Sequence, residues 1–310
     1  MGKVLVTGAA GYVGNRVALE LKSLGHSVRI FIKPKYKEYF KSSDFEVYTG
    51  DVLDFESVDK ACRGMDTIVH FIALVDRECK DNPAKAFEIT GLGTKNFLEA
   101  AAKNNVKNFI YISTYHVYDL SAGSVIKEST QLGPTNLDKI EYGASHIVAE
   151  MFCNAYKESR KMNAIILRVS NVYGAPINKD VDRWTLVPLS FCRQAFENKR
   201  ITMTSDGAQT RDFVSIPDIV KSIQLVITKK LKQHIFNVGN GKSTSIMELA
   251  KAVASAYKRK FNKEIKIEHG STKTNDPQFT YDISRLKELG YAPKDTMEDE
   301  FVRTFDVLSS

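Results

Sequence analysis

Three glycines near the N-terminus have the spacing of a turn that binds phosphate groups. Gly8, Gly11 and Gly14 directly follow the apolar run 3–7, and apolar residues then recur at helical spacing as far as Leu24. In a strand, glycine turn and helix of this kind, backbone N–H groups at the helix N-terminus can meet a diphosphate without Cβ atoms in the way. The pattern favours a dinucleotide site, although a tight turn of this kind also needs glycines for packing alone.

The wider sequence resembles a known enzyme family. The turn, written TGAAGYVG, has Gly-x2-Gly-x2-Gly spacing. It resembles that of the extended short-chain dehydrogenases/reductases, specifically their nucleotide-sugar epimerase/dehydratase branch. Further segments resemble the branch in the same order along the chain: YISTYHVY at 111–118, YGASH at 142–146, LRVSNVYGAP at 167–176, GAQTRDFVSIPD at 207–218, DIS at 282–284 and LGYAP at 289–293. The resemblance implies a Rossmann fold and hydride transfer with a nicotinamide cofactor.

The resemblance also implies three catalytic side chains. Thr114 corresponds to the residue that hydrogen-bonds the reacting sugar oxygen, and Tyr142 to the tyrosine that moves its proton. His146 stands where the family has a lysine, and positions i and i+4 share a helix face. Tyr115 and His116 occupy positions that are carboxylates in the sugar 4,6-dehydratases, which argues against that activity.

Replacing lysine by histidine changes the chemistry expected at Tyr142. A unit charge about 4–5 Å away, at an effective dielectric constant near 20, is worth roughly 3–4 kcal/mol. This would bring a phenol from a pKa of ~10 to about 7–8. Neutral imidazole supplies little of that energy, and histidine is protonated only below about pH 6.5. We therefore expect Tyr142 to be a poorer base than in its relatives but still a proton donor, with His146 orienting the cofactor ribose.

The predicted cofactor contacts follow the strands of the first half. Many such proteins have an acidic residue that binds the adenosine ribose at the position of Ile32, which cannot accept from a hydroxyl. Lys33 could pair with the 2′-phosphate of NADP and so favours NADP over NAD. The alternative is that Lys33 is only a solvated loop charge. Asp51 corresponds to the residue that binds the adenine amino group; alternatively it caps the helix beginning near Asp54. Thr90 replaces the family's asparagine and lacks its amide donor. The full predicted set is Gly8, Gly11, Tyr12, Val13, Gly14, Lys33, Asp51, Val52, Phe71, Ile72, Ala73, Thr90 and Val169.

Three residues of the second half are expected to bind a nucleoside-diphosphate sugar. By the same resemblance, Asn171 contacts the diphosphate or the sugar. Arg211 is the expected diphosphate clamp, because a guanidinium can bind phosphate oxygens bidentately. Lys273 begins the segment 273–277 and replaces an arginine that touches the second phosphate.

Two other polar segments are expected to be structural. Residues 239–243 resemble the tail of an ATP-binding phosphate loop, but Phe236 stands where that loop needs its first glycine. We therefore reject an ATPase. Asp218 is expected to cap or brace a helix.

Alternating strands and helices must position these residues. Strands are predicted at 27–33, 45–49, 67–73, 108–114 and 163–170, and the clearest helices at 84–104 and 140–160. This alternation predicts a parallel sheet covered on both faces, with ligands at the carboxyl ends of its strands. We expect an α/β protein with a Rossmann-type doubly wound domain over 1–172. A smaller α/β part over 173–310 mainly binds substrate, and residues 211–240 cross back.

The composition is that of an ordinary globular protein, with 310 residues of which 43% are hydrophobic and 26% charged. The sequence contains no run of 18 apolar residues, so we expect no membrane span. The N-terminus enters a strand without room for a signal peptide. The net charge of +7 favours phosphorylated ligands over nucleic acid, because the lysines are scattered. Four dispersed cysteines predict free thiols, no metal site and a cytoplasmic protein: Cys62, Cys79, Cys153 and Cys192.

The sequence thus predicts hydride transfer on a nucleoside-diphosphate sugar, by an epimerase of the 4-epimerase type or a 4-keto-sugar reductase. Two other classes remain open. A non-catalytic cofactor sensor is favoured by the replaced lysine and asparagine, whereas a reductase of small carbonyl compounds would leave Arg211 idle. A homodimer through the helices at 84–104 and 140–160 is expected by analogy.

Overall fold

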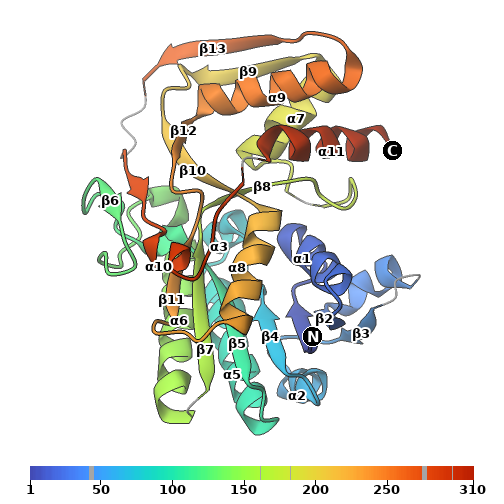
Figure 1. The fold of residues 1–310 in the computed structure, drawn as a ribbon, viewed down its shortest axis with the longest axis vertical. Coiled ribbons are helices and arrows are strands. Elements are labelled where there is room, and N and C mark those ends of the chain that lie inside the picture. Colours follow the sequence, from blue (N-terminus) through green and yellow to red (C-terminus); the bar gives the residue numbers. More distant parts are fainter. Residues whose placement is uncertain (42–44, 161, 182, 274–277, 295) are drawn as a thin grey trace.

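The largest element of the protein is a parallel sheet of seven strands (Figure 1). The computed structural model describes residues 1–41, 45–160, 162–181, 183–273, 278–294 and 296–310. In spatial order the strands are β11 (Ile235–Val238), β7 (Asn163–Val169), β5 (Asn108–Thr114), β4 (Thr67–His70), β1 (Lys3–Thr7), β2 (Ser27–Ile32) and β3 (Glu46–Thr49). The strand order reverses between β1 and β4, where doubly wound sheets bind their ligands. The predicted Rossmann-type sheet is confirmed.

Helices cover both faces of this sheet, because successive strand residues point to opposite sides. Val4 and Val6 of β1 pack with α1 (Tyr12–Ser23) and α8 (Ile216–Thr228). Leu5, between them, packs on the opposite face. The helices there are α2 (Phe55–Cys62), α5 (Gly93–Lys103) and α6 (Ile140–Arg160).

Two predicted elements of the first half differ from the structure. The helix predicted at 84–104 is divided into α4 (Pro83–Ala86), the π-helical turn η2 (Phe87–Leu92) and α5. Within it, the Thr94 hydroxyl donates to the Thr90 carbonyl at 2.6 Å. The strand predicted at 67–73 ends at His70, because the N–H of Phe71 bonds the Thr7 hydroxyl at 3.2 Å. Residues 71–75 consequently form a loop beside the glycine turn.

The second half of the chain builds a smaller α/β unit at one end of the sheet (Figure 1, top). Helices α7 (Val187–Asn198), α9 (Ile246–Phe261) and α11 (Met297–Ser309) share a core with the parallel pair β9 (Arg200–Ser205) and β13 (Lys266–Thr272). A three-stranded sheet joins the two units: β12 (Ser243–Ser245), β10 (Thr210–Ser215) and β8 (Asn171–Tyr173). The smaller elements are α3 (Asp76–Asp81), β6 (Val125–Ile126), β14 (Thr280–Tyr281), α10 (Ser284–Lys287), η1 (Pro34–Phe40), η3 (Tyr115–Val117) and η4 (Leu137–Lys139).

The chain crosses back to the first unit between β10 and β12. Helix α8 packs against α1, and β11 pairs with β7 in the large sheet. Asp218, in the first turn of α8, accepts hydrogen bonds from the Ser215 hydroxyl and the backbone N–H of Lys294, as expected of a bracing residue. The exact division of the chain into domains stays a prediction.

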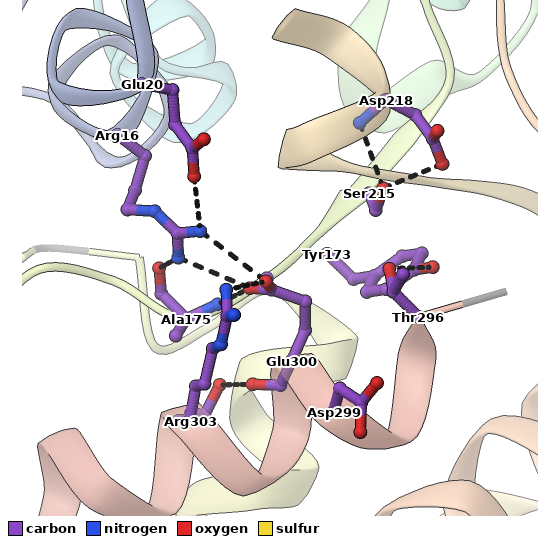
Figure 2. A network of polar contacts seen from close by, with 12 residues as sticks. Arg16, Glu20, Tyr173, Ala175, Ser215, Asp218, Thr296, Asp299, Glu300 and Arg303 are labelled. Atoms are coloured by element: carbon purple, nitrogen blue, oxygen red, sulfur yellow. Dashed lines mark hydrogen bonds and ion pairs between the residues drawn. The ribbon is translucent and has the colours of Figure 1, made fainter. Parts of the chain in front are cut away.

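An ion-pair network around the buried Glu300 side chain connects α11 to α1. Figure 2 shows Arg16 between Glu20, the Ala175 carbonyl and Glu300. Glu300 also accepts the backbone N–H of Ala175 at 2.8 Å and pairs with Arg303 at 3.0 Å. These contacts hold the helix of the glycine turn against the second unit.

The cysteines and acidic side chains of the described residues do not build a metal centre. All four cysteines are buried free thiols, as predicted. Within the ranges given above, no three His, Cys, Asp or Glu side chains gather as metal ligands would. Among the described helices, none has both the length and the hydropathy needed to cross a membrane.

Candidate active site

The glycine turn is shaped by two close backbone approaches. Gly8 has a φ of +68°, and a Cβ built on it would lie 3.1 Å from the backbone carbon of Phe71. A Cβ on Gly14 would lie 2.6 Å from the Gly8 carbonyl oxygen. Helix α1 then begins after Gly11, whose N-cap position provides no side-chain hydrogen bond, and its first turn has no acidic residue. The N-terminal N–H groups and the helix dipole therefore suit an anion such as a diphosphate.

Replacing Gly14 with alanine should weaken cofactor binding about tenfold, which is roughly 1.4 kcal/mol. The new methyl group would force the turn apart at the Gly8 carbonyl and displace the N–H groups of α1. Titration of NADH or NADPH fluorescence measures the effect. Gly133→Ala is the control, because its Cβ would lie 3.9 Å from Asp119, an ordinary contact. An unchanged dissociation constant for Gly14→Ala would refute this view of the turn.

Tyr12 does more than occupy the turn. Its buried hydroxyl donates to the Gly174 carbonyl at 2.6 Å, just after β8. Burial is the main reason that the pKa of this phenol lies well above its usual range. The side chain thus joins the glycine turn to the second unit, which sequence reasoning missed because Gly174 lies 162 residues away. Val13, next in α1, is half-buried.

The loop after β4 is tied down on both sides. The Thr90 hydroxyl accepts a hydrogen bond from the Leu74 N–H at 3.1 Å, so threonine keeps a structural bond here despite lacking an amide. Beneath the loop, His70 bonds Thr7 through Nδ1 at 2.9 Å and Thr94 through Nε2 at 3.2 Å. Thr90 itself is fully buried, whereas the predicted cofactor contacts of the loop are half-buried: Phe71, Ile72 and Ala73.

The predicted adenosine contacts lie after β2 and β3. Lys33 and Asp51 are exposed, whereas Val52 is buried. The alternative that Asp51 caps the next helix is wrong. The N-cap of α2 is Asp54, which accepts the Glu56 N–H at 3.1 Å, while Asp51 accepts the N–H of Leu53 at 2.9 Å. Val169, the last predicted cofactor contact, is buried at the end of β7.

The structure brings the three predicted catalytic side chains together. Thr114 ends β5, and Tyr142 and His146 lie one turn apart at the start of α6. The Thr114 side chain lies near enough to the Tyr142 phenol to oppose part of the rise that burial causes in its pKa. The rings of Tyr142 and His146 meet edge to face, with their centroids 4.6 Å apart.

Burial makes both rings of this pair neutral. It raises the pKa of Tyr142 to about 12 and lowers the pKa of His146 to about 3. The nearby charge of Arg183 and the neighbouring Thr114 side chain oppose the rise in the pKa of Tyr142, whereas the charge of Asp76 adds to it. At neutral pH the site therefore holds a phenol and an uncharged imidazole, the state expected of a Tyr–His pair.

The site contains two further aromatic side chains. In the sequence, Tyr115 and His116 stood out only because they replace the carboxylates of the sugar 4,6-dehydratases. His116 is buried, its ring centroid lies 6.0 Å from that of Tyr142, and its Nδ1 has no hydrogen-bond partner in the described part of the chain. Tyr115 stacks on His116 at 4.1 Å and donates to the Asn171 side chain at 3.3 Å. Their position directly after β5 was the signal that could have marked them as site residues.

The predicted substrate contacts lie on neighbouring strands. Asn171 of β8 donates to the Asp212 carbonyl at 3.0 Å, so one of its two amide N–H groups is already engaged within the protein. Arg211 of β10 is half-buried and donates to the Thr210 carbonyl. Burial lowers the pKa of His116, and the charge of Arg211 adds to this effect. Lys273 is exposed after β13. Residues 274–277 of its predicted segment lie outside the described residues.

Comparison with known proteins supports the family resemblance seen in the sequence. The sequence model of the NAD dependent epimerase/dehydratase family matches residues 4–239. The chain belongs to this family. This epimerase/dehydratase family member is therefore an enzyme that uses a nicotinamide cofactor, as the resemblance implied.

Individual relatives cover nearly all of the chain. The "Uncharacterized UDP-glucose epimerase YtcB" of Bacillus subtilis (strain 168) is 30% identical over 99% of this chain and 98% of its own length. The chain is also 28% identical to the trifunctional UDP-glucose 4,6-dehydratase/UDP-4-keto-6-deoxy-D-glucose 3,5-epimerase/UDP-4-keto-L-rhamnose-reductase RHM1 of Arabidopsis thaliana. That match covers 98% of this chain but only 46% of the plant protein, so the chain spans about half of its length.

A solved structure confirms the fold. The UDP-glucuronic acid 4-epimerase of Bacillus cereus, in complex with UDP-glucuronic acid and NAD, matches with a TM-score of 0.79. The match covers 99% of both chains at 24% identity. At this identity the likeness establishes the α/β fold of this family member and no finer property.

Proposed function

We propose that this enzyme transfers a hydride at a carbon of a nucleoside-diphosphate sugar, as a 4-keto-sugar reductase or a 4-epimerase. The observation that carries the proposal is the buried, protonated phenol of Tyr142, packed on His146 at the start of α6 and beside Thr114 at the carboxyl end of β5. Asn171 and Arg211 on the adjoining strands supply the groups for a diphosphate sugar. The Bacillus cereus structure, which holds UDP-glucuronic acid and NAD, supports the same pairing of ligands.

The residues present fit a nicotinamide dinucleotide. The close approach at Gly14 and the uncapped start of α1 make a cradle for the diphosphate. Lys33 and Asp51 would face the adenosine, and residues 71–73 with Val169 would line the remainder. When bound, the cofactor gives or takes the hydride.

The proton chemistry favours reduction. A reduced carbonyl needs a proton at its oxygen, and Tyr142 holds one, because the pKa of its phenol is about 12. The opposite reaction, oxidation of a hydroxyl, needs the phenolate, and roughly one such phenol in 100,000 is ionised at pH 7. Thr114 positions the oxygen. Epimerisation starts with such an oxidation, so we rank keto-sugar reduction first.

An NMR assay tests the proposal. The purified protein is incubated with a panel of nucleotide sugars and 4-keto-sugars, with NAD(H) and NADP(H) supplied separately. Product formed one-to-one with loss of reduced cofactor identifies a reductase, whereas interconversion without net cofactor change identifies an epimerase. Cofactor binding without turnover of any sugar would contradict the proposal and favour the sensor.

We also propose NADP as the preferred cofactor. Ile32, at the end of β2, is buried and cannot accept from a ribose hydroxyl, while Lys33 beside it is exposed. Lys33→Glu should weaken NADPH binding about tenfold, or roughly 1.4 kcal/mol, by replacing attraction to the 2′-phosphate with repulsion. NADH affinity should stay within about twofold, and this discrimination should fade at high salt. Lys37→Glu on η1 is the control. Equal losses for both cofactors would disprove the assignment.

A homodimer through η2, α5 and α6 remains our proposal for the assembly. Four large apolar side chains on these elements are exposed: Phe87 (38%), Leu92 (50%), Ile140 (38%) and Met151 (64%). A dimer through these elements would cover such side chains. The molar mass in solution, compared with 34.8 kDa for one chain, decides between the two states.

A further inference from the structure

The imidazole of His146 is enclosed beneath Tyr142. Only 2% of the residue is exposed, and its Nδ1 lies 2.6 Å from the hydroxyl oxygen of Tyr111. Tyr111 belongs to β5, on the strand that ends in Thr114, and is fully buried. Within the described residues, Nε2 of His146 is buried without any hydrogen-bond partner. A polar atom in this position needs a partner from outside the chain, because buried polar groups are rarely left unsatisfied.

Hydrogen-bond accounting fixes the position of the imidazole proton. If Tyr111 donates to Nδ1, the ring hydrogen must sit on Nε2, and a single hydrogen-bonding hydrogen is left without an acceptor. If Nδ1 donated instead, the hydroxyl hydrogen of Tyr111 and the lone pair of Nε2 would both be buried unpaired. In the described part of the chain, the Tyr111 hydroxyl has no second partner to relieve this. The first arrangement leaves fewer buried groups unsatisfied and is therefore favoured.

The proton on Nε2 points away from Tyr111. The two nitrogens of an imidazole direct their bonds to different sides of the ring, so a ring that is bonded to Tyr111 through Nδ1 turns Nε2 elsewhere. The same ring meets Tyr142, one helical turn earlier, edge to face. His146 and the catalytic phenol thus occupy one face of α6. An oxygen acceptor entering this face would satisfy the unpartnered N–H.

We propose that Tyr111 is a positioning residue that holds His146 as the Nε2–H tautomer, so that a neutral N–H donor faces a ribose hydroxyl of the bound dinucleotide. The identity of this ligand rests on the proposed function; the tautomer does not. His146, held by Tyr111, would bind the ribose through a hydrogen bond and would not place a charge beside Tyr142. This separates cofactor binding from the tuning of the phenol.

The tautomer can be measured without substrate or cofactor. In protein labelled with 15N-histidine, two-bond correlations assign the proton of each of the six imidazoles, and the signals of His146 are identified by their loss in His146→Gln. We expect Nε2–H in the wild-type protein at neutral pH. Tyr111→Phe should abolish the preference or reverse it. A wild-type Nδ1–H tautomer, or an unchanged tautomer in Tyr111→Phe, would overturn the role of Tyr111.

Affinity tests the ligand. On addition of NADPH or NADH, the Nε2–H signal of His146 should shift, and Tyr111→Phe should raise the cofactor dissociation constant about tenfold with kcat at saturation changed less than threefold. In a His146→Gln background, Tyr111→Phe should have no further effect on affinity. Tyr118→Phe is the matched control, since it removes another fully buried hydroxyl, bonded to Asn237 and Arg168, without touching His146.

The outcomes keep the two proposals apart. An unmoved Nε2–H signal with saturating cofactor would refute the ribose contact. The predicted tautomer and its dependence on Tyr111, found in a protein that turns over no sugar, would leave this inference standing while the proposed function fails.

Discussion

Tyr142→Phe should lower kcat by about 1,000-fold while the cofactor dissociation constant stays within about twofold. General acid catalysis by a positioned side chain contributes roughly 10²–10⁴-fold, and the buried, protonated phenol of Tyr142 is the proposed proton donor. The substitution removes one oxygen atom and keeps the ring. Its packing against His146 and the small cluster of Leu74, Cys79 and Ala86 is thereby retained.

Turnover and binding should be measured on the same preparation, with NADPH oxidation for the first and fluorescence titration for the second. Tyr156→Phe is the matched control, because Tyr156 also lies on α6 and its hydroxyl bonds Glu99 rather than a site residue. It should keep near wild-type activity. If Tyr142→Phe retained more than a tenth of kcat, another group would have to donate the proton.

His146→Lys should move the pH profile of the reaction down by about 2 units. An ammonium group about 4–5 Å from the phenol, at an effective dielectric constant near 20, stabilises the phenolate by roughly 3–4 kcal/mol, and part of this is lost to the burial of the new charge. The pKa of Tyr142, raised to about 12 by burial, would fall towards the ordinary range.

The lower pKa of Tyr142 in His146→Lys should affect oxidation and reduction in opposite ways. Oxidation of a sugar hydroxyl needs the phenolate, so its rising limb should appear at lower pH and its rate at pH 7 should increase about 100-fold. Reduction needs the phenol, so its activity should decline at lower pH than in the wild-type enzyme. A rate and a pH profile that do not change would disprove our account of the Tyr–His pair.

Arg183→Gln provides a control of opposite sign. Arg183 is a cation whose charge lowers the pKa of Tyr142, and it also pairs with Asp76 at 3.7 Å. Its removal should shift the same limb to higher pH. If His146→Lys and Arg183→Gln shift the same limb of the pH–rate profile in opposite directions, the group that titrates there is Tyr142.

Thr90 bears on the competing idea of a non-catalytic sensor. Two departures from the family favoured that idea, the histidine at 146 and the threonine at 90. The Thr90 hydroxyl accepts the N–H of Leu74 and so holds the loop after β4 in place. Only the histidine remains as a departure that alters the chemistry, and the two substitutions above test it directly.

The sequence by itself determined the sheet, the turn and the catalytic strand end. These features depend on local patterns: apolar strands of period two, helices of period 3.6, and glycines whose missing Cβ atoms allow the backbone to approach closely. The positions of Gly8 and Thr114 at the carboxyl ends of β1 and β5, and of Gly14 and Tyr142 in the first turns of α1 and α6, follow from the chain order alone. The strand predicted at 67–73 was too long. It ends at His70 because the Thr7 hydroxyl, on the neighbouring strand, accepts the N–H of Phe71.

Only the tertiary structure decided what surrounds these residues. The partner of His146 is Tyr111, 35 residues earlier, and the Tyr12 hydroxyl reaches Gly174 across the interface of the two units. The pKa of Tyr142 depends on its burial and on Arg183, neither of which a YxxxH spacing reveals. Periodicity specifies which face of an element is buried, but hydrogen-bond partners and electric fields come from whichever distant residues the packed core brings within a few ångströms.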